Sequence, residues 1–446
     1  MGLKKLLEKI PGYDQLVLPL HRAQSFRAAN KYDYPASSMK VIGVTGTNGK
    51  TTTCFMIHSM LTEAGFKTGL MTTVAHGVGR DLKPQISHMT TVSAGLLNQR
   101  IAAMRDAGAE YLVLEVTSHA LAQYRVFGIP FDVVVFTNIT HEHLDYHKTF
   151  ANYLKAKLKL FKLAHKTHGG KKIGIVNYAD PAAEYFADAI DRPLAYGIER
   201  GDIVARQVKL TAAGVEYYVK LPRALKEEFP EIDEQNFSDK LHIRTNIPGE
   251  FNVYNSLAAM TVGLVYGLTA RQIEDGIAAL PGVEGRMTRI DEGQKFTVIV
   301  DFAHTPDSFE QLLSDFRAST RGKLIVMFGS AGRRDETKRA VQGKIAGKYA
   351  DVVVLTEEDD RDVDGQEILT QIASGAEKSG KKLDQDLFKV LDRTAAIEFA
   401  LKQASGADDV VMLLGKGHEK TIERADGAHP WDEVGTTRKL LRERAD

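Results

Sequence analysis

A glycine-rich turn between an apolar stretch and a predicted helix has the composition of a phosphate-binding loop. Residues 41–53 read Val-Ile-Gly-Val-Thr-Gly-Thr-Asn-Gly-Lys-Thr-Thr-Thr. Glycines allow backbone N–H groups to turn toward phosphate oxygens, and the start of the following helix adds a partial positive charge. The Lys50 ammonium adds a full charge, and the Thr51 hydroxyl can bind Mg²⁺. The chain is therefore predicted to bind a nucleoside triphosphate through Gly46, Thr47, Asn48, Gly49, Lys50, Thr51 and Thr52.

This loop departs from the commonest phosphate-loop pattern. G-x-x-x-x-G-K-[ST] requires a glycine at position 44, where the chain has Val44. Glycine-rich turns between a strand and a helix also occur without a ligand. The lysine and three threonines that follow at once, and the apolar strand that precedes, favour phosphate binding over that alternative.

Polar residues at the ends of other predicted strands extend the candidate site. Glu115 closes the run Tyr-Leu-Val-Leu-Glu, and a carboxylate at the end of a parallel strand beside a phosphate loop can bind Mg²⁺. A helix cap or a surface acid is the alternative. The segment Thr137–His147 carries three histidines in seven residues, which raises the possibility of zinc, but the spacing of structural zinc sites is missing. We favour His143 as a ligand of Mg²⁺ or of a substrate carboxyl group, with the other two as hydrogen-bonded loop residues.

Three further turns in the C-terminal half also follow predicted strands. They are Asp301-Phe-Ala-His-Thr-Pro, the Arg-rich segment 329–339 and Gly415-Lys-Gly-His-Glu. Arginine suits carboxylate and phosphate recognition through its planar fork. Each turn alone could be an ordinary capped loop, but three of them after three strands of one domain favour a ligand site.

The elements that position these residues indicate an α/β fold. Apolar runs alternate with longer helical patterns, which predicts mostly parallel sheets covered by helices. We expect a short N-terminal helical segment and linker, a P-loop-type central domain with a mostly parallel sheet, and a C-terminal Rossmann-like α/β domain; their predicted ranges are 1–37, 38–281 and 282–446. The predicted strands are 40–44, 111–116, 133–138, 173–177, 297–301, 323–328, 352–356 and 410–414, with antiparallel strands at 215–221 and 241–245. The predicted helices include 255–265, 337–348 and one from Asp307.

Composition excludes several classes of protein. A chain of 446 residues is too long to fold around a single hydrophobic core, so two or three domains are expected. The 58 basic and 58 acidic residues balance, which argues against binding nucleic acid by charge. The single cysteine, Cys54, excludes a disulfide framework within the chain. No uninterrupted apolar run is long enough for a membrane span, and no secretory signal is recognisable, so we expect a cytoplasmic enzyme and a monomer.

The motifs as a set resemble those of the Mur ligase family. The N-terminal half contributes Gly46–Thr53, Glu115-Val-Thr-Ser-His-Ala-Leu, Thr137-Asn with His143-Leu-Asp-Tyr-His, and Gly249-Glu-Phe-Asn-Val-Tyr-Asn. The C-terminal half contributes Gly285-Arg-Met and the three turns described above. The similarity covers about residues 38–446. It is greatest to the MurE-type branch, whose members add a diamino acid to UDP-N-acetylmuramoyl-L-alanyl-D-glutamate.

The resemblance implies ATP-dependent amide ligation in peptidoglycan synthesis. ATP would phosphorylate a carboxylate to an acyl phosphate, and the amine of a diamino acid would displace the phosphate. Two Mg²⁺ ions and a carbamylated lysine are implied as well, since CO₂ addition would turn Lys157 into an anion that binds metal. By resemblance, the catalytic residues are Lys50, Glu115, His143 and Lys157, and the Mg²⁺ ligands are Thr51, Glu115, His143 and carbamylated Lys157.

Other positions match the family's ligand contacts. Asn252, Asn255, Arg286 and Asp301 resemble contacts to ATP. Thr117, Gln123 and Arg125 align with residues that hold the muramoyl-peptide substrate. The remaining positions, which align with the substrate and acceptor amino-acid pocket, are His304, Arg334, Asp359, Arg361, Gly415 and Glu419.

Two departures from the family pattern affect the expected substrates. About 37 residues stand where the family has a domain that binds UDP. The chain is therefore expected to bind the nucleotide weakly, to use a partner, or to act on a related substrate that lacks UDP. The acceptor motif Asp-Asn-Pro-Arg is here Glu358-Asp-Asp-Arg361. We favour meso-diaminopimelate, whose distal carboxylate Arg361 could bind. The alternatives are L-lysine, another acid substrate and an ATP-binding assembly subunit without turnover. A folate ligase is disfavoured because that branch has a Gly-Lys-Gly loop.

Overall fold

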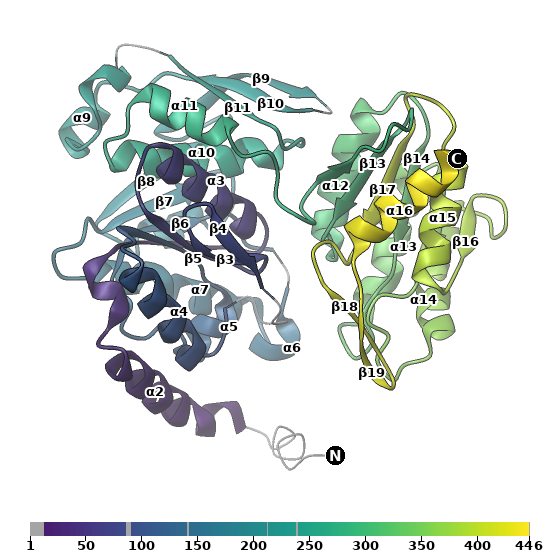
Figure 1. Cartoon of the computed structure of the whole chain (residues 1–446), viewed down its shortest axis with the longest axis horizontal. Helices are drawn as coiled ribbons and strands as arrows, with labels where there is room; N and C mark the ends of the chain where they lie inside the picture. The colour runs from purple at the N-terminus through teal and green to yellow at the C-terminus, as the bar shows by residue number, and fades with distance from the viewer. Residues whose placement is uncertain (1–12, 86–90, 141, 212, 238–239, 446) are drawn as a thin grey trace. The chain divides into compact units, whose positions relative to one another are not determined.

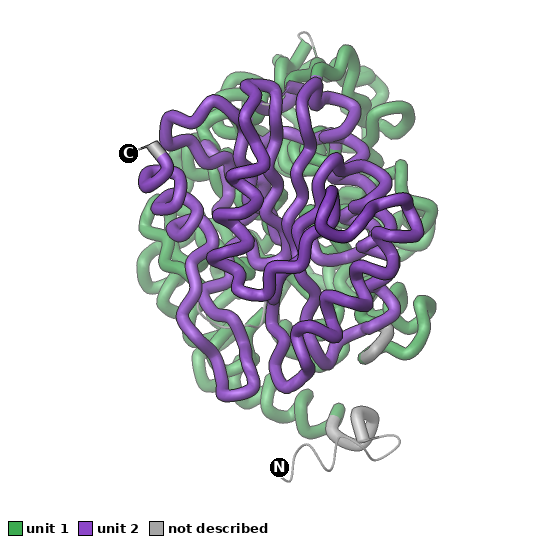
Figure 2. The backbone as a smooth tube through the Cα atoms, turned by 90° about the vertical axis from the view of Figure 1, so that its right-hand side faces the viewer, with its two compact units in different colours: residues 1–209, 216–245, 251–280 green, residues 210–215, 246–250, 281–446 purple. Residues whose placement is uncertain are grey.

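The computed structural model of the chain describes residues 13–85, 91–140, 142–211, 213–237 and 240–445. It divides into two units, which Figure 2 distinguishes by colour. Unit 1 comprises Met1–Lys209, Glu216–Thr245 and Phe251–Leu280, and unit 2 comprises Leu210–Val215, Asn246–Glu250 and Pro281–Asp446. The predicted domain limits stay a prediction.

Unit 1 is built on an 11-stranded sheet in the order β11-β10-β9-β8-β7-β6-β1-β5-β2-β3-β4. The strands from β9 to β2 in this order pair in parallel, and β3 and β4 add antiparallel edge strands. The central strands are almost wholly buried because helices cover both faces of a parallel sheet. The strands are β1 (Lys40–Thr45), β2 (Thr68–Met71), β3 (Ala75–Val78), β4 (Asp81–Pro84), β5 (Tyr111–Glu115), β6 (Phe131–Phe136), β7 (Ile173–Asn177), β8 (Arg192–Gly197), β9 (Ile203–Thr211), β10 (Gly214–Val219) and β11 (Leu241–Thr245).

Helices cover this sheet on both sides (Figure 1). One side has α3, α10 and α11, which pack against one another, and the other has α4, α5 and α7. Apart from Phe251 and Tyr254, every residue of α10 is buried, as expected for a helix that is apolar nearly all round. The helices are α2 (Tyr13–Lys31), α3 (Lys50–Glu63), α4 (Ala94–Asp106), α5 (Ser118–Ala122), α6 (Leu144–His147), α7 (Phe150–His165), α8 (Ala183–Ala187), α9 (Leu225–Glu228), α10 (Phe251–Val265) and α11 (Ala270–Ala278), with 3₁₀ turns η1 (Pro35–Ser38) and η2 (Glu234–Phe237).

Unit 2 is a smaller α/β layer structure. Its 6-stranded sheet has the order β12-β13-β17-β14-β15-β16, parallel except for the β12–β13 pair, and a separate hairpin joins β18 to β19. The strands are β12 (Thr288–Ile290), β13 (Thr297–Asp301), β14 (Leu324–Phe328), β15 (Val352–Leu355), β16 (Leu387–Lys389), β17 (Val410–Leu414), β18 (Thr421–Arg424) and β19 (Gly427–Pro430). The helices are α12 (Pro306–Ser319), α13 (Thr337–Tyr349), α14 (Gly365–Lys378), α15 (Arg393–Gln403) and α16 (Glu433–Ala445).

The α/β class with mostly parallel sheets is confirmed, and every strand predicted above is present within about two residues at most ends. In the N-terminal region, α2 runs for 19 residues and continues through Pro19. A proline inside a helix removes one backbone hydrogen bond but does not always end the helix. None of the helices in the described ranges is both long and apolar enough to span a membrane.

Candidate active site

The loop between β1 and α3 can be built only with glycine at two points. Gly49 caps α3 with φ 82°, a left-handed conformation that favours glycine. A Cβ atom at Gly49 would lie 2.3 Å from Oδ1 of Asn255, and one at Gly46 would lie 1.9 Å from Oγ1 of Thr137. These close approaches explain why the loop sequence is glycine-rich at these two positions.

Neighbouring strand ends fix the conformation of this loop. The Asn48 backbone N–H donates to Oδ1 of Asn138 at 2.8 Å, and the Asn138 amide returns a bond to the Asn48 carbonyl at 3.1 Å. The Thr47 hydroxyl lies 3.0 Å from the Tyr153 hydroxyl. The Lys50 ammonium donates to the Thr47 carbonyl at 2.7 Å, so its charge lies at the loop. The result is a preformed, positively charged turn at a helix start, which suits a phosphate group.

The Glu115 carboxylate lies directly beside this helix start. Its Oε2 accepts hydrogen bonds of 3.0 Å from the Thr51 hydroxyl and from both the backbone N–H and the hydroxyl of Thr73. Glu115 is only 2% exposed, at the end of β5. The pairing of a buried carboxylate with a threonine hydroxyl gives two hard oxygen donors at one point, which fits Mg²⁺.

A cluster of imidazole rings lies in the segments that follow β5 and β6, with His119 on α5 and His147 on α6. The ring of His119 is 4.8 Å from that of His143 and 5.5 Å from that of His147. Burial and the nearby positive potential, chiefly from His143, lower the pKa of His119 to about 3, so this ring is neutral near pH 7. Nε2 of His147 pairs with the Ser118 hydroxyl at 3.0 Å. The cluster is thus a polar wall with His143 as one member.

No group of three or more His, Cys, Asp or Glu side chains within the described ranges is arranged to hold a metal ion. One of the three histidines considered for zinc, His141, lies outside those ranges. His143 adopts a left-handed backbone conformation with φ 56°, which is rare for a residue with a side chain and marks a constrained position.

Lys157 is buried in α7 at the phosphate loop. Its side chain donates to the Gly46 carbonyl, and its Nζ lies 4.7 Å from the centre of the Tyr153 ring. Burial, reinforced by the Lys50 charge, holds the pKa of Lys157 well below its ordinary value. Tyr153 also faces His143, with 6.0 Å between ring centres, so this tyrosine links the loop, the lysine and the histidine.

The three residues predicted to hold the muramoyl peptide lie close together after β5. Thr117 caps α5, and its hydroxyl lies 3.3 Å from that of Thr91. Arg125 donates two bonds, of 3.0 and 2.6 Å, to Oε1 of Gln123 and one of 2.6 Å to the Thr91 carbonyl. Gln123 in turn donates to the Tyr146 hydroxyl at 3.2 Å, next to the imidazole cluster. These contacts form a connected polar surface beside the cluster.

Asn252 and Asn255 lie at the start of α10, next to the phosphate loop. The Asn255 amide donates to Oδ1 of Asn252 at 2.8 Å and accepts from the Thr53 hydroxyl at 3.2 Å. Both are nearly fully buried. Their proximity to Gly49 links them to the nucleotide site, while contact with a base stays a prediction.

In unit 2, Arg286, Asp301 and His304 surround the end of β13. Asp301 accepts backbone bonds from Met287 at 2.8 Å and from Ala303 at 2.7 Å. Burial raises the pKa of Asp301, although the Arg286 charge opposes this. The Arg286 guanidinium lies 4.6 Å from the centre of the Phe302 ring, and that ring also packs against His304.

Charged residues predicted for the acceptor pocket meet at the ends of β15 and β17. Lys416, which is fully buried, donates to Oδ1 of Asp359 at 2.8 Å and to Oε2 of Glu419 at 2.6 Å. Burial opposes the charged form of Lys416, but the two carboxylates raise its pKa above the ordinary value. Arg361 donates to Oε2 of Glu423 at 2.7 Å and also to the Gly332 carbonyl. Arg361 is therefore already paired with a carboxylate of the chain, a contact that the sequence did not predict.

The remaining predicted positions border the same strand ends. Gly415 has φ 103°, and a Cβ there would lie 2.8 Å from Oε2 of Glu358. Burial and the adjacent acids raise the pKa of Asp360 to about 6. Arg334 is exposed in the loop before α13.

Sequence reasoning missed several residues that complete this geometry. Three of them lie inside motifs that were already recognised, so their polar character was a usable signal: Asn138, His119 and Lys416. Tyr153 lies four residues before Lys157, outside those motifs. Thr73 and Glu423 lie on the loop after β2 and on β18, two elements that the sequence did not predict, and had no such signal.

Comparison with known proteins identifies the family. The family profile described as Mur ligase middle domain matches residues 44–263, and that described as Mur ligase, glutamate ligase domain matches residues 285–417. A UDP-N-acetylmuramyl-tripeptide synthetase of Roseiflexus sp. (strain RS-1) is 39% identical, over 93% of this chain and 81% of that protein. The chain belongs to the Mur ligase family. The family expected from the motifs is therefore confirmed.

A further relative and two solved structures are similar to this chain. UDP-N-acetylmuramoyl-L-alanyl-D-glutamate–2,6-diaminopimelate ligase 1 of Clostridium acetobutylicum is 38% identical over 95% of this chain and 82% of that protein. A solved structure of a ligase with the same substrate name has a TM-score of 0.63 and 27% identity, covering 96% of this chain and 82% of the other. Folylpolyglutamate synthase of Mycobacterium tuberculosis, solved with ADP and AMPPCP, has a TM-score of 0.70 at 16% identity, covering 95% and 94%, and shares the fold.

Proposed function

We propose that this Mur ligase family member adds a diamino acid, meso-diaminopimelate, to a muramoyl-L-alanyl-D-glutamate donor at the expense of ATP. The observation that carries the proposal is the preformed loop at Gly46–Thr51, with the Thr51 hydroxyl bonded to the buried Glu115 carboxylate. The relatives at 38–39% identity are named for this donor or its tripeptide product, which supports the substrate class. Because the reaction consumes ATP, we expect it in the cytoplasm.

The predicted chemistry has two steps. A carboxylate oxygen of the donor attacks the terminal phosphorus of ATP, releasing ADP and forming an acyl phosphate. The uncharged amine of the diamino acid then attacks the acyl carbon and the C–N bond forms. The nitrogen loses one proton to solvent, and phosphate leaves with the pair of electrons of the broken C–O bond. Both steps gather anions and develop negative charge, so fixed cations at the site lower the barrier.

Residues of unit 1 are suited to the first step. Lys50 and the loop N–H groups would bind the phosphates, and Thr117, Gln123 and Arg125 would hold the donor. The oxygen donors Thr51 and Glu115 would hold Mg²⁺, with His143 and a carbamate on Lys157 as proposed further ligands. Mg²⁺ would supply charge neutralisation of the phosphate oxygens.

Residues of unit 2 are suited to the acceptor. The acids Asp359 and Glu419 around Lys416 would favour a ligand that carries an ammonium group, and Arg361 would bind a carboxylate. Diaminopimelate and lysine both have a distal ammonium, but only diaminopimelate has a distal carboxylate. Pairing of Arg361 with that carboxylate would therefore discriminate between the two amino acids.

A phosphate-release assay tests the activity. Purified protein should release phosphate from ATP and Mg²⁺ only when a muramoyl dipeptide donor and a diamino acid are both present, with a product of the mass of the amide. Tight ATP binding without product from any amino acid would instead support a subunit without turnover. Phosphate release with lysine but not with diaminopimelate would show that lysine is the acceptor amino acid.

Replacing Arg361 with alanine is expected to lower kcat/KM for diaminopimelate more than for lysine. Loss of one charge-assisted contact should cost about 1.5–3 kcal/mol, or roughly 10- to 150-fold. The matched control is Arg333→Ala, because Arg333 lies in the same region and pairs with Asp362 on the exposed surface. An equal decrease in kcat/KM for both amino acids would show that Arg361 does not bind the distal carboxylate.

A further inference from the structure

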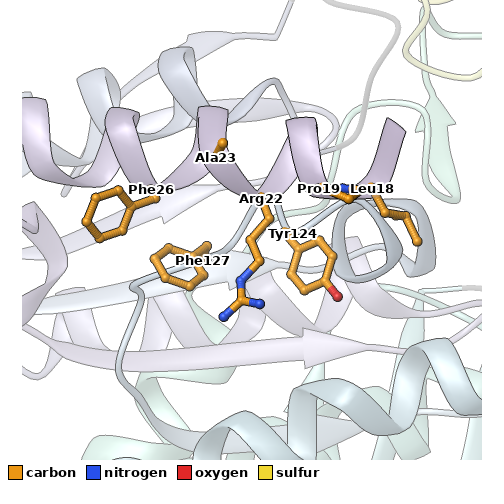
Figure 3. A pocket seen from close by; sticks show the side chains of 7 residues that line it. All are labelled: Leu18, Pro19, Arg22, Ala23, Phe26, Tyr124 and Phe127. Atoms are coloured by element: carbon orange, nitrogen blue, oxygen red, sulfur yellow. The ribbon is translucent and has the colours of Figure 1, made fainter. Parts of the chain in front are cut away.

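An apolar groove lies between helix α2 and the turn that follows α5. Figure 3 shows the side chains that line it, and its volume is about 590 Å³, within the range of pockets for small molecules. We call it the α2 groove, and its lining residues are Leu18, Pro19, Arg22, Ala23, Phe26, Tyr124 and Phe127.

The groove is a fixed feature of unit 1, because α2 is anchored to the unit. Ser25 and Ala29 on α2 are only 2% and 1% exposed. Farther along the chain, the Tyr32 carbonyl accepts a bond of 3.2 Å from Arg105 of α4. The wall that α2 contributes is therefore held in place by packing and a hydrogen bond.

Aromatic rings and one cation give this groove a recognisable chemistry. The rings of Phe26 and Phe127 lie 6.0 Å apart edge to face, and Phe26 is 49% exposed. The Arg22 side chain leaves α2 and points toward the space between Tyr124 and Phe127 (Figure 3). Exposed aromatic faces can stack on a planar base, and a guanidinium binds phosphate oxygens through two parallel bonds.

Further positive charge lies at the Tyr124 end of the groove. The Lys159 ammonium of α7 is 5.3 Å from the centre of the Tyr124 ring. Partial burial and the neighbouring Lys155 lower the pKa of Lys159, as expected for cations crowded together. Within the described part of the chain, neither of these lysines nor Arg22 forms an ion pair with a carboxylate. The charge is therefore available to an anionic ligand.

The groove includes a residue that adjoins the proposed donor site in the sequence. Tyr124 stands between Gln123 and Arg125, two of the residues proposed to hold the muramoyl peptide, and these two are hydrogen-bonded to each other. In the donor named by the relatives, a sugar and the L-Ala-D-Glu dipeptide separate the reacting carboxylate from UDP. The dipeptide alone spans up to about 7 Å, so the diphosphate must lie well beyond the reacting end.

We propose that the α2 groove binds the uridine diphosphate end of the donor, with the uracil against Phe26 and Phe127 and the diphosphate at Arg22 and Lys159. This proposal rests on the proposed function for the identity of the donor. It assigns UDP recognition to residues of α2 and the turn after α5, and so gives these N-terminal residues a role in choosing the donor.

Binding of UDP itself tests the groove without any turnover. Calorimetry is done with the phosphate loop filled by a non-hydrolysable ATP analogue, so that UDP cannot bind there. Arg22→Glu is expected to weaken UDP binding at least about tenfold, as for loss of a charge-assisted contact. The matched control is Arg27→Glu, which makes the same charge change at an exposed position of α2 outside the groove. Circular dichroism checks that both variants are folded.

Kinetics provide the second readout. For Arg22→Glu, the ratio of kcat/KM for the UDP-linked donor to that for muramoyl-L-Ala-D-Glu without UDP should fall about tenfold, whereas Arg27→Glu should keep the wild-type ratio. UDP binding that is absent, or equal in the two variants, overturns the groove proposal even if the protein is an active ligase. Arg22-dependent binding to anionic lipid vesicles, without UDP binding, would reassign the groove to a membrane surface. No ligation with either donor would refute the proposed function, while the calorimetry would still decide the groove.

Discussion

Replacing Lys157 with alanine should reduce amide ligation at least about 100-fold, and a short carboxylic acid such as acetate should restore part of the activity. The pKa of Lys157 is held well below its ordinary value by burial and by the Lys50 charge, which favours the uncharged amine. An uncharged amine can attack CO₂, which forms an N–C bond, releases one proton and leaves a carbamate anion. That anion is suited to Mg²⁺ at the loop, whereas an ammonium would repel the ion.

Two controls make this test specific. Lys162→Ala removes an exposed lysine from the same helix and should keep wild-type activity. Lys157→Arg places a guanidinium at this position, which cannot form a carbamate, and acetate should not rescue it because the site is still filled. A carbonyl ¹³C signal from labelled bicarbonate should appear in the wild-type protein and be absent from both Lys157 variants. Full activity in Lys157→Ala would remove the carbamate from the mechanism.

The sheets and the phosphate loop could be predicted because their signals are local. Buried parallel strands such as β5 and β14 are short continuous apolar runs, and each is followed by polar residues at the sheet edge where ligands bind. The loop glycines are required by the backbone and by close contacts at Gly46 and Gly49, so their identity and spacing were visible in the sequence.

Contacts between distant segments could not be predicted in the same way. The strands β3 and β4 are four residues each, partly exposed at the sheet edge, and β4 ends in Pro84, so they have no clear apolar pattern. The pairing of Arg361 with Glu423 joins residues 62 positions apart through the β18–β19 hairpin. Sequence motifs identified Arg361 as a candidate, but only the fold shows that a carboxylate of the chain already binds it.

This pairing changes what Arg361 can do. A substrate carboxylate at Arg361 must share the guanidinium with Glu423, or displace it, since Nε and Nη1 already donate to Glu423 and Gly332. The position of Arg361 thus depends on the hairpin and on the strand ends of unit 2. Residues that hold those strand ends should therefore affect acceptor binding without touching the acceptor.

Among the residues that hold the strand ends of unit 2, Arg393 is expected to have the largest effect. Arg393→Met should lower the free energy of unfolding of unit 2 by about 3–5 kcal/mol. Both side chains of the Arg393–Glu433 pair are 0% exposed, and the guanidinium forms two bonds, of 2.8 and 2.7 Å, with the carboxylate. Removing the arginine leaves the Glu433 charge buried without its cation. Trp431, the single tryptophan, donates to Glu433 at 2.7 Å, so its fluorescence during urea unfolding reports on this unit.

Two further variants separate the buried charge from lost packing. Arg442→Met breaks an ion pair with Glu292 whose arginine side chain is 65% exposed, and should barely move the unfolding midpoint. The double variant Arg393→Met with Glu433→Met should recover much of the lost stability, because no charge then remains buried. If Arg393→Met alone unfolds at the same urea concentration as the wild-type protein, this account is wrong.

The same substitution should also weaken the acceptor site. Arg393 donates to the carbonyls of Glu357 and Leu414 at 2.8 Å each, and these residues lie at the ends of β15 and β17, next to Asp359 and Gly415. Under conditions where Arg393→Met remains folded, KM for the diamino acid should therefore rise while KM for the donor changes little. A uniform loss of activity with unchanged KM values would mean that Arg393 supports only the stability of unit 2 and not the geometry of its pocket.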